Sequence, residues 1–283
     1  MESVGYYNGE MGAPEDLRVP FLDRANYFGD GVYDGAMARD GVILFEDEHL
    51  ARFEDSLAVL RIDVPWTRAW LSGELHRVLD QCSVRDTFVY WQVTRGTAPR
   101  DHTFPAVEPN LWITVTPHPF SDLSKTIDVA SFEDKRFSYC NAKTLNLIPN
   151  VLAAQHALER GCQEAVFVRD GYVTESAHSN IHILVKGTLV THPADDHILP
   201  GIARRHLLDM CATLGIPVEE RLYTLDELMA ADEVVVSASS TFGIRVAHVD
   251  GVAVGGRDQA TYERLCDALN CEFEDYIATH TKD

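Results

Sequence analysis

Lysine is scarce in this sequence, and one of its five lysines lies where its amine could react. Lys143 precedes Leu145, Leu147 and Ile148 directly before a predicted helix, whereas the other four lysines occur in polar segments. Burial among those apolar residues would favour the neutral amine, which attacks a carbonyl to give a Schiff base. A lysine that only lays its stem along a strand end would show the same pattern. The spacing alone therefore leaves both interpretations open.

Three further segments carry groups that suit a phosphorylated cofactor. Glu175 follows the turn Asp170-Gly171, and in a cleft its carboxylate could hold a proton on a pyridine nitrogen or act as an acid or base. Gly201-Ile202-Ala203 opens a predicted helix, whose first backbone N–H groups attract anions. Ser239-Ser240-Thr241 could add hydroxyl donors for the same anion, or could simply form a turn.

A loop rich in hydrogen-bond donors, residues 92–102, follows a predicted strand. The guanidinium of Arg100 can bind a carboxylate through two parallel hydrogen bonds, and His102 could add a further donor. Surface pairing of Arg100 with a neighbouring acid is the ordinary alternative. Because the chain carries a net charge of −20, an anionic substrate needs local basic groups, for which Arg52, Arg100 and Arg136 are candidates.

Two other patterns are weak. The segment Gly29–Gly35 is rich in glycine, but its spacing is not that of the dinucleotide-binding fingerprint. His178 and His182 are four residues apart, yet the sequence places no carboxylate ligand with them. We predict neither a nicotinamide cofactor nor a metal.

The composition argues against several classes of partner. Asp and Glu outnumber Lys and Arg by 44 to 24, so the surface field repels nucleic acid and anionic lipid headgroups. No apolar run approaches the length of a membrane span, and the first ten residues lack the features of a signal peptide. The six cysteines form no C-x-x-C pair. We therefore expect a cytoplasmic protein with reduced thiols that binds neither nucleic acid nor membrane.

The hydrophobic pattern predicts two α/β (α+β) domains, residues 1–119 and a larger 120–283. Asn8-Gly9 and Asp40-Gly41 predict hairpin turns in the first domain. Asp47 is a plausible cap for a following helix, and a second helix from Thr67 is expected to bury Trp70 together with its leucines. The remaining predicted strands are 88–93, 111–115, 126–132, 164–168, 181–185 and 233–236. The remaining predicted helices are 150–160, 202–214 and 259–276.

Taken in order, these segments resemble one family, the fold type IV pyridoxal phosphate (PLP) transaminases, and within it the D-amino-acid aminotransferases. The resemblance covers nearly the whole chain. It is carried by Asp23-Arg24, Tyr27–Tyr33, His49–Phe53, Gln92–His102, Lys143–Leu147, Val173–Glu175, Ser179-Asn180, Thr191–Pro193 and Ile198–Ile202.

The resemblance implies a role for each matched residue. Lys143 would bind PLP as a Schiff base and move the proton during transamination, and Glu175 would keep the pyridine nitrogen protonated. The phosphate would be held by Arg52, the N–H groups of Ile202 and Ala203, and the hydroxyls of Ser240 and Thr241. The substrate carboxylate would be bound by Tyr33, Arg100 and His102. Arg136 matches a position near the cofactor.

The resemblance also implies the reaction and the assembly. The amino group would move between D-amino acids and 2-oxo acids, for example from D-alanine to 2-oxoglutarate, giving pyruvate and D-glutamate. The active site would lie between two domains in a homodimer, with the carboxylate-binding residues contributed across the interface. A branched-chain L-amino-acid transaminase, an (R)-amine transaminase and an aminodeoxychorismate lyase on the same fold are alternatives. A PLP carrier without turnover and a hydrolase that uses His178 belong to other functional classes.

The sequence departs from the family pattern at two places. Ser176-Ala177-His178-Ser179 replaces a run of small hydroxyl residues, so His178 could face the substrate and change its range. Ala203 stands where threonine is usual, which removes one hydroxyl but leaves the backbone N–H groups. These departures bear on the substrate more than on the reaction.

Overall fold

The computed structural model describes residues 1–122 and 124–281, and the chain forms two compact units. Unit 1 contains residues 1–120, 142–146 and 275–283, and unit 2 contains residues 121–141 and 147–274. The units are therefore not contiguous in the sequence. The predicted division after residue 119 lies one residue from the first crossing of the chain, but the short segment that carries Lys143 belongs to unit 1.

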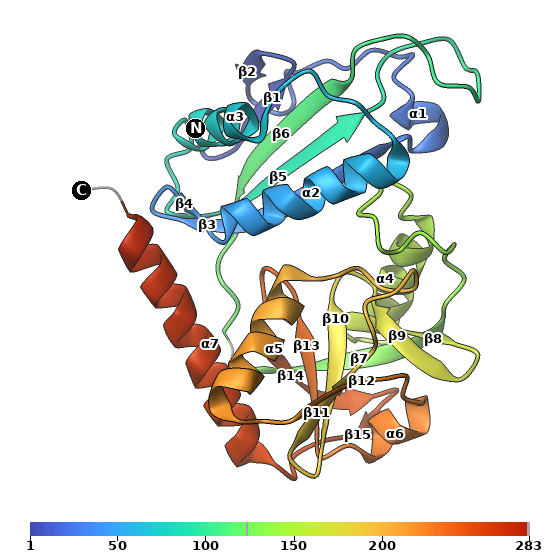
Figure 1. Ribbon diagram of the computed structural model, residues 1–283, viewed down its shortest axis with the longest axis vertical. Coiled ribbons are helices and arrows are strands. Elements are labelled where there is room, and N and C mark those ends of the chain that lie inside the picture. Colours follow the sequence, from blue (N-terminus) through green and yellow to red (C-terminus); the bar gives the residue numbers. More distant parts are fainter. Residues whose placement is uncertain (123, 282–283) are drawn as a thin grey trace. The chain divides into compact units, whose positions relative to one another are not determined.

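Unit 1 is built on a six-stranded antiparallel sheet in the order β2-β1-β6-β5-β3-β4 (Figure 1). Its strands are β1 (Val4–Tyr7), β2 (Glu10–Gly12), β3 (Gly31–Arg39), β4 (Val42–Ile43), β5 (Asp86–Thr94) and β6 (Asn110–Pro117). Its helices are α1 (Ala25–Phe28), α2 (Glu46–Leu60) and α3 (Arg68–Leu79). The predicted hairpins are confirmed, since Asn8-Gly9 joins β1 to β2 and Asp40-Gly41 joins β3 to β4, all with positive φ.

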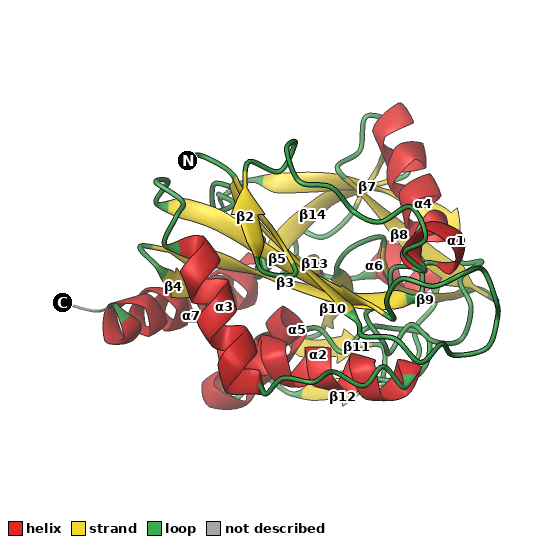
Figure 2. Ribbon diagram, turned by 90° about the horizontal axis from the view of Figure 1, so that it is seen from above, coloured by secondary structure: helices red, strands yellow, loops and turns green. Residues whose placement is uncertain are grey.

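One face of this sheet is buried under α2 and α3 (Figure 2). Alternate residues of the strands, such as Val32, Trp91 and Ile113, point into that core. Phe53 on α2 and Leu75 on α3 fill it from the helix side. Neighbouring strand residues, including Tyr33, consequently lie on the opposite face.

Two local predictions in unit 1 were wrong. Trp70 is 43% exposed and stacks on Trp66 at 5.7 Å between ring centres, because the apolar stripe of α3 is completed by its leucines and Val78. Asp47 is not a cap, since α2 begins at Glu46 after Phe45 and no side chain caps it. Asp47 instead lies among three acids of the first turn, where negative charge stabilises a helix N-terminus. Thr67 does cap α3, through a hydrogen bond from the backbone N–H of Trp70.

Unit 2 is built on a nine-stranded mixed sheet in the order β12-β11-β10-β13-β14-β7-β8-β9, with β15 paired to β14. Its strands are β7 (Thr126–Glu133), β8 (Glu164–Arg169), β9 (Tyr172–Ser176), β10 (Asn180–Val185), β11 (Thr188–Thr191), β12 (Val218–Glu220), β13 (Glu233–Ser237), β14 (Ile244–Val249) and β15 (Val252–Ala253). Its helices are α4 (Ile148–Glu159), α5 (Ile202–Leu214), α6 (Leu225–Ala230) and the first part of α7 (Gln259–His280).

Helices connect two of the three parallel strand pairs of unit 2, as expected for crossover connections. Helix α4 links β7 to β8, and α5 links β11 to β12. Helices α5 and α7 pack over the sheet through Leu207, Cys211, Leu265 and Leu269. The predicted mixed α/β architecture is confirmed for both units.

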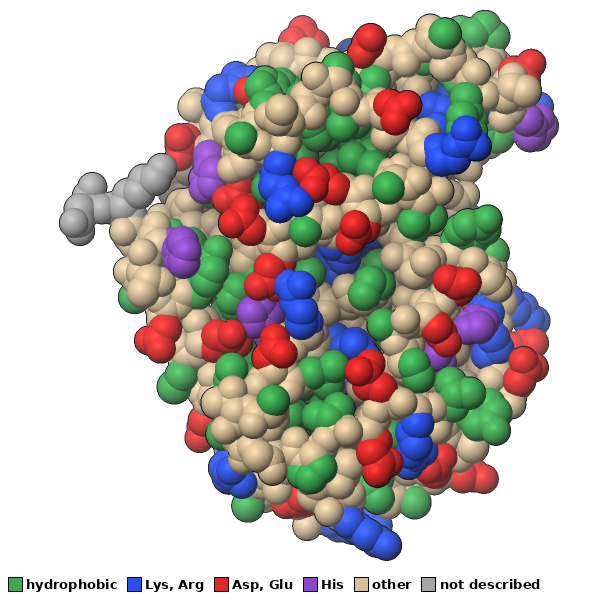
Figure 3. Space-filling model, in the orientation of Figure 1, with side chains coloured by type: hydrophobic (Ala, Val, Ile, Leu, Met, Phe, Trp, Pro, Cys, Tyr) green, Lys and Arg blue, Asp and Glu red, His purple; other side chains and the backbone are tan. Residues whose placement is uncertain are grey.

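The charged side chains on the surface agree with the acidic composition of the chain. On the face drawn in Figure 3, acidic side chains are scattered over the surface and basic side chains lie among them. Within residues 1–122 and 124–281, no helix is long and apolar enough to cross a membrane.

Candidate active site

Lys143 is placed in unit 1 by the edge of strand β3. The short strand β4 pairs with the end of β3 only, which leaves the first half of that edge open. Segment 142–146 occupies it, because the N–H of Tyr33 donates to the carbonyl of Lys143 at 2.9 Å and the N–H of Leu145 donates to Gly31 at 3.0 Å. The N–H of Lys143 also donates to Ser56 Oγ on α2 at 3.0 Å. Lys143 is therefore fixed by its backbone, and its side chain is not needed to hold the segment.

The amine of Lys143 lies over an aromatic ring. Nζ is 4.4 Å from the centre of the Tyr33 ring, which is the distance of a cation–π contact. Tyr33 in turn stacks on Tyr90 with ring centres 5.5 Å apart. Lys143 is half-buried, although Ile148, one of the apolar residues that marked it in the sequence, is 71% exposed.

Arg52 lies on α2 and pairs with a buried acid of β3. Its Nε and Nη2 are 2.9 and 2.7 Å from the two carboxylate oxygens of Asp34, and His49 Nδ1 is 2.9 Å from Asp34 Oδ1. Burial alone would raise the pKa of Asp34, but the charge of Arg52 and the contact with His49 outweigh it and hold that pKa well below its usual range. Asp34 therefore stays ionised and fixes the guanidinium.

Glu175 lies on β9 in unit 2 and is almost completely buried. Its Oε1 accepts a hydrogen bond from Arg136 Nη1. Its Oε2 accepts from Asn180 Nδ2 and from the N–H of Leu199, both at 3.0 Å. These donors favour the ionised carboxylate, which can accept a hydrogen bond from a protonated pyridine nitrogen.

Arg136, which binds Glu175 directly, is itself fixed by a second buried acid, Asp134. Its Nε and Nη2 donate to Asp134 at 3.0 and 2.9 Å, and its guanidinium lies 4.2 Å from the centre of the Phe167 ring. Burial opposes the charge of Arg136, yet the bonds to Asp134 and Glu175 raise its pKa above the ordinary value. Burial would raise the pKa of Asp134, but its bonds with Arg136 lower it to about 2. Two of the three arginines proposed as a basic pocket, Arg52 and Arg136, are thus paired with internal acids.

The start of α5 has the features of an anion site. Gly201 caps the helix without any side-chain hydrogen bond, so the first N–H groups, including those of Ile202 and Ala203, lack a capping acceptor. A Cβ at Gly201 would overlap Asn180 Oδ1, and only glycine therefore permits this close approach. In the turn after β13, Thr241 Oγ1 is buried and has no hydrogen-bond partner in the described residues.

Asn180 connects these parts of unit 2. Its amide Nδ2 donates both to Glu175 and to the carbonyl of Leu199, at 3.0 Å each. In the sheet register Asn180 is opposite Ser237, the last residue of β13 before the turn that carries Ser240 and Thr241. Glu175, the start of α5 and that turn therefore meet at one end of the sheet. Sequence reasoning assigned no role of its own to Asn180, because an asparagine at a strand end is usually only a turn residue.

The three residues predicted to bind the substrate carboxylate fall into two groups within unit 1. Arg100 and His102 are exposed and both contact Phe28, at 5.1 and 5.2 Å from its ring centre. Tyr33 contacts Lys143 and Tyr90 instead. The prediction that all three act together needs a second copy of the chain and remains a prediction.

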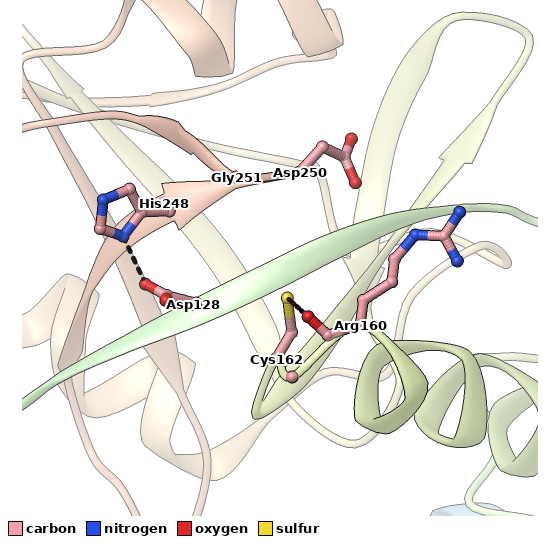
Figure 4. A pocket seen from close by; sticks show the side chains of 7 residues that line it. Asp128, Arg160, Cys162, His248, Asp250 and Gly251 are labelled. Carbon is pink, nitrogen blue, oxygen red and sulfur yellow. Dashed lines mark hydrogen bonds and ion pairs between the residues drawn. The ribbon is translucent and has the colours of Figure 1, made fainter.

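A pocket of about 290 Å³ opens elsewhere in unit 2 (Figure 4). It is lined by Asp128, Arg160, Gly161, Cys162, His248, Asp250 and Gly251. None of the predicted site residues lines it. His248 points to Asp128, with 2.7 Å between Nδ1 and Oδ1, so the two polar groups satisfy each other.

The histidines set aside as metal ligands have other partners. His178 is exposed, and its Nδ1 lies 3.0 Å from the buried carboxylate of Glu164. His182 is fully buried, with its two nitrogens 2.8 Å from the hydroxyls of Thr191 and Ser237. Burial lowers the pKa of His182 to about 3 and keeps it neutral.

The donors of each unit match one part of a phosphorylated pyridine aldehyde. Unit 2 supplies a buried carboxylate for a ring nitrogen, an uncapped helix start and the unpartnered hydroxyl of Thr241 for a phosphate. Unit 1 supplies the amine of Lys143 for a carbonyl. Fold and site together define an enzyme of the PLP-dependent class.

The comparisons name the family. Residues 31–249 match the model of the class IV aminotransferases, and the chain belongs to that family. Relatives include D-alanine aminotransferases of Staphylococcus epidermidis, 34% identical with 98% of both chains covered, and of Bacillus licheniformis, 35% identical with 88 and 89% covered. The branched-chain amino acid aminotransferase of Escherichia coli superposes with a TM-score of 0.87 at 26% identity, covering 96 and 95% of the two chains. This protein is a PLP-dependent transaminase.

Substitution of Gly201 by Ala should weaken PLP binding about tenfold, because the new Cβ displaces Asn180 and one or two hydrogen bonds of about 1 kcal/mol are lost. The dissociation constant is measured by titrating PLP into apoenzyme and following absorbance. Gly73→Ala on α3 is the matched control, since its Cβ meets no atom within 4 Å. Equal PLP affinity in both variants would contradict the role assigned to this contact.

The Asp134 carboxylate should make stability depend on acid pH. Its pKa is depressed on folding, so its contribution is complete above the unfolded pKa near 4 and is lost as the pH falls through about 2. We expect wild type to lose about 2 to 3 kcal/mol of unfolding free energy from this group, whereas Asp134→Asn is less stable at pH 7 and lacks that loss. Urea unfolding between pH 7 and pH 2 measures both, with the exposed Asp209→Asn as control. Parallel profiles for wild type and Asp134→Asn would contradict the assignment.

Proposed function

We propose that this chain moves the amino group between D-amino acids and 2-oxo acids, with D-alanine and 2-oxoglutarate giving pyruvate and D-glutamate as the model reaction. The observation that carries the proposal is the 34% identity to a D-alanine aminotransferase over 98% of both chains. The E. coli branched-chain enzyme shares the fold at lower identity, 26%. The paired Arg100 and His102 at Phe28 add support, since both can donate to a carboxylate.

Lys143 is the proposed catalytic residue. PLP bound at Lys143 would supply an electron sink for negative charge at the substrate α-carbon. Once the substrate amine has displaced Lys143 from the cofactor carbonyl carbon, the freed Nζ would take the proton from the substrate α-carbon and return it at the cofactor carbon C4′. Its place beside the Tyr33 ring, on a segment fixed by backbone hydrogen bonds, supports this role because a proton carrier needs a constant position.

Glu175 is proposed to keep the pyridine nitrogen protonated, since Arg136 and Asn180 hold its carboxylate ionised. The phosphate is assigned to Arg52, the N–H groups of Ile202 and Ala203, and the hydroxyls of Ser240 and Thr241. The uncapped start of α5 and the unpartnered Thr241 Oγ1 support the assignment to unit 2. The fixed guanidinium of Arg52 supports the assignment to unit 1.

We also propose a homodimer in which Arg100 and His102 act on the substrate held at Tyr33 of the other copy. Helix α4 supports this assembly. It buries only Ala153 and Ala157, while four large apolar side chains are 57 to 71% exposed. These are Ile148, Val151, Leu152 and Leu158. A patch of this kind on a helix marks a protein interface. The six unpaired cysteines further support a cytoplasmic location.

The reaction is tested by adding D-alanine or L-alanine to the purified holoenzyme and following cofactor absorbance. We expect D-alanine alone to convert the yellow form to the colourless amine form, and 2-oxoglutarate to restore it. Lys143→Ala should abolish conversion, whereas Lys125→Ala, with its side chain 75% exposed, should behave as wild type. Conversion by L-amino acids only would move the assignment to the branched-chain type.

The assembly is tested by sedimentation of wild type and of the double variant Val151→Glu, Leu152→Glu. Wild type should sediment at twice the chain mass of 31.6 kDa, and the double variant should shift toward monomer with loss of activity. Val252→Glu, which changes an equally exposed side chain on β15, should remain dimeric. A monomeric, active wild type would contradict both the dimer and the sharing of Arg100 and His102.

A further inference from the structure

Four side chains form one row across the face of the unit 1 sheet that α2 and α3 leave uncovered. Tyr33 on β3 is directly opposite Gln92 on β5, Gln92 is opposite Trp112 on β6, and Trp112 is opposite Tyr7 on β1. Directly opposed residues point to the same side of a sheet. Because the Tyr33 ring contacts Lys143 Nζ, the row begins at the reactive amine.

Gln92 in this row has an unused donor. Its side chain is 7% exposed, and its Oε1 accepts a hydrogen bond from the Tyr90 hydroxyl at 2.7 Å. Within the described residues Nε2 donates to no acceptor, and unlike Trp112 Nε1 it is not fully buried, so it remains accessible to a ligand. Burial raises the pKa of Tyr90, so its hydroxyl stays protonated and continues to donate. The amide group of Gln92 is thereby turned with its two N–H bonds away from Tyr90.

Tyr90 ties Gln92 to the reactive lysine. The same residue that orients the Gln92 amide stacks on Tyr33, whose ring contacts Lys143. Gln92 is the direct cross-strand neighbour of Tyr33, and neighbouring strands are about 4.8 Å apart, so the Gln92 amide lies within reach of a group bonded to a carbon held at Tyr33. The next residue in the row, Trp112, has an indole Nε1 that is also buried and without a partner. Gln92 and Trp112 therefore both present neutral donors along this row.

We infer that the Gln92 side-chain amide, oriented by Tyr90, donates a hydrogen bond to the α-carboxylate of the substrate beside Tyr33. The inference rests on the proposed transamination of amino acids. An α-carboxylate has only acceptors, is common to every amino and 2-oxo acid, and is bonded directly to the carbon that must lie at Lys143 Nζ. Gln92 is then a specificity-determining residue that favours acids over amines.

The inference is tested on holoenzyme by comparing wild type with Gln92→Leu and Gln92→Glu. We expect the KM for D-alanine and for D-glutamate to rise about tenfold or more in Gln92→Leu, with a smaller change in kcat, because a hydrogen bond to a charged group is lost. Gln92→Glu keeps the acceptor for Tyr90 but replaces the donors with negative charge, so it should be worse than Gln92→Leu. A merely structural role predicts the reverse order. Gln81→Leu, at an exposed position, is the matched control.

A second readout needs no turnover. Propionate, an unreactive analogue of alanine, is titrated into each holoenzyme by calorimetry, and its dissociation constant should rise in Gln92→Leu by the same factor as the KM. Unchanged propionate binding, or a KM effect confined to D-glutamate, would overturn the inference, the latter because it places the contact on the substrate side chain. If wild type binds propionate in a Gln92-dependent way but does not transaminate D-amino acids, the proposed function fails while the carboxylate contact stands.

Discussion

The ion cluster around Arg136 is the constraint on which the cofactor side of unit 2 depends. A guanidinium this deeply buried is tolerated only when its charge is balanced and its donors are used, and Asp134 and Glu175 provide both. Glu175 is then fixed through its second oxygen by Asn180 and the backbone of Leu199. Strand β9, the start of β10 and the approach to α5 are thereby tied into one network. Removing any one side chain of this network leaves a buried charge or donor unpaired. The positions of these strands relative to one another are therefore tightly fixed.

In unit 1, backbone hydrogen bonds rather than ion pairs position Lys143. The chain returns from unit 2 for only five residues, 142–146, and they complete the edge of β3 that β4 leaves open. Gly31 is required there, since a Cβ would overlap the carbonyl of Val93 and the side chain of Leu145. The side chain of Lys143, the proposed catalytic residue, is thus carried by a short segment whose backbone is fixed by hydrogen bonds to β3 and to Ser56.

Local patterns in the sequence predicted the longer helices and many strands, but β9, β11, β12, β14 and α6 were not predicted. Partners distant in the sequence could not be predicted. Turn dipeptides, helix periodicity and the glycine before α5 act within a few residues, so they located the hairpins, α5 and the phosphate-suited helix start. Trp70 was wrongly predicted to be buried, because periodicity identifies the apolar side of a helix but not which residues at the border of that side are exposed. The partners of Arg136 and Arg52 were missed because Glu175 lies 39 residues from Arg136 and Asp34 lies 18 residues from Arg52. Only the tertiary packing, of α2 on β3 for Arg52 and of the segment after β7 against β9 for Arg136, brings such acids to a given arginine.

These pairings change how an enzyme with a net charge of −20 can bind anions. The expected basic pocket loses Arg52 and Arg136 as free cations, since internal carboxylates neutralise them. Unit 2 keeps two neutral donor groups, the start of α5 and the hydroxyl of Thr241, and unit 1 keeps the amide of Gln92 and the exposed guanidinium of Arg100. Neutral donors that are fixed in position bind an anion with little reorganisation. In the proposed function the geometry of these donors, together with Arg100, selects phosphate and carboxylate, while the acidic surface keeps other anions dilute.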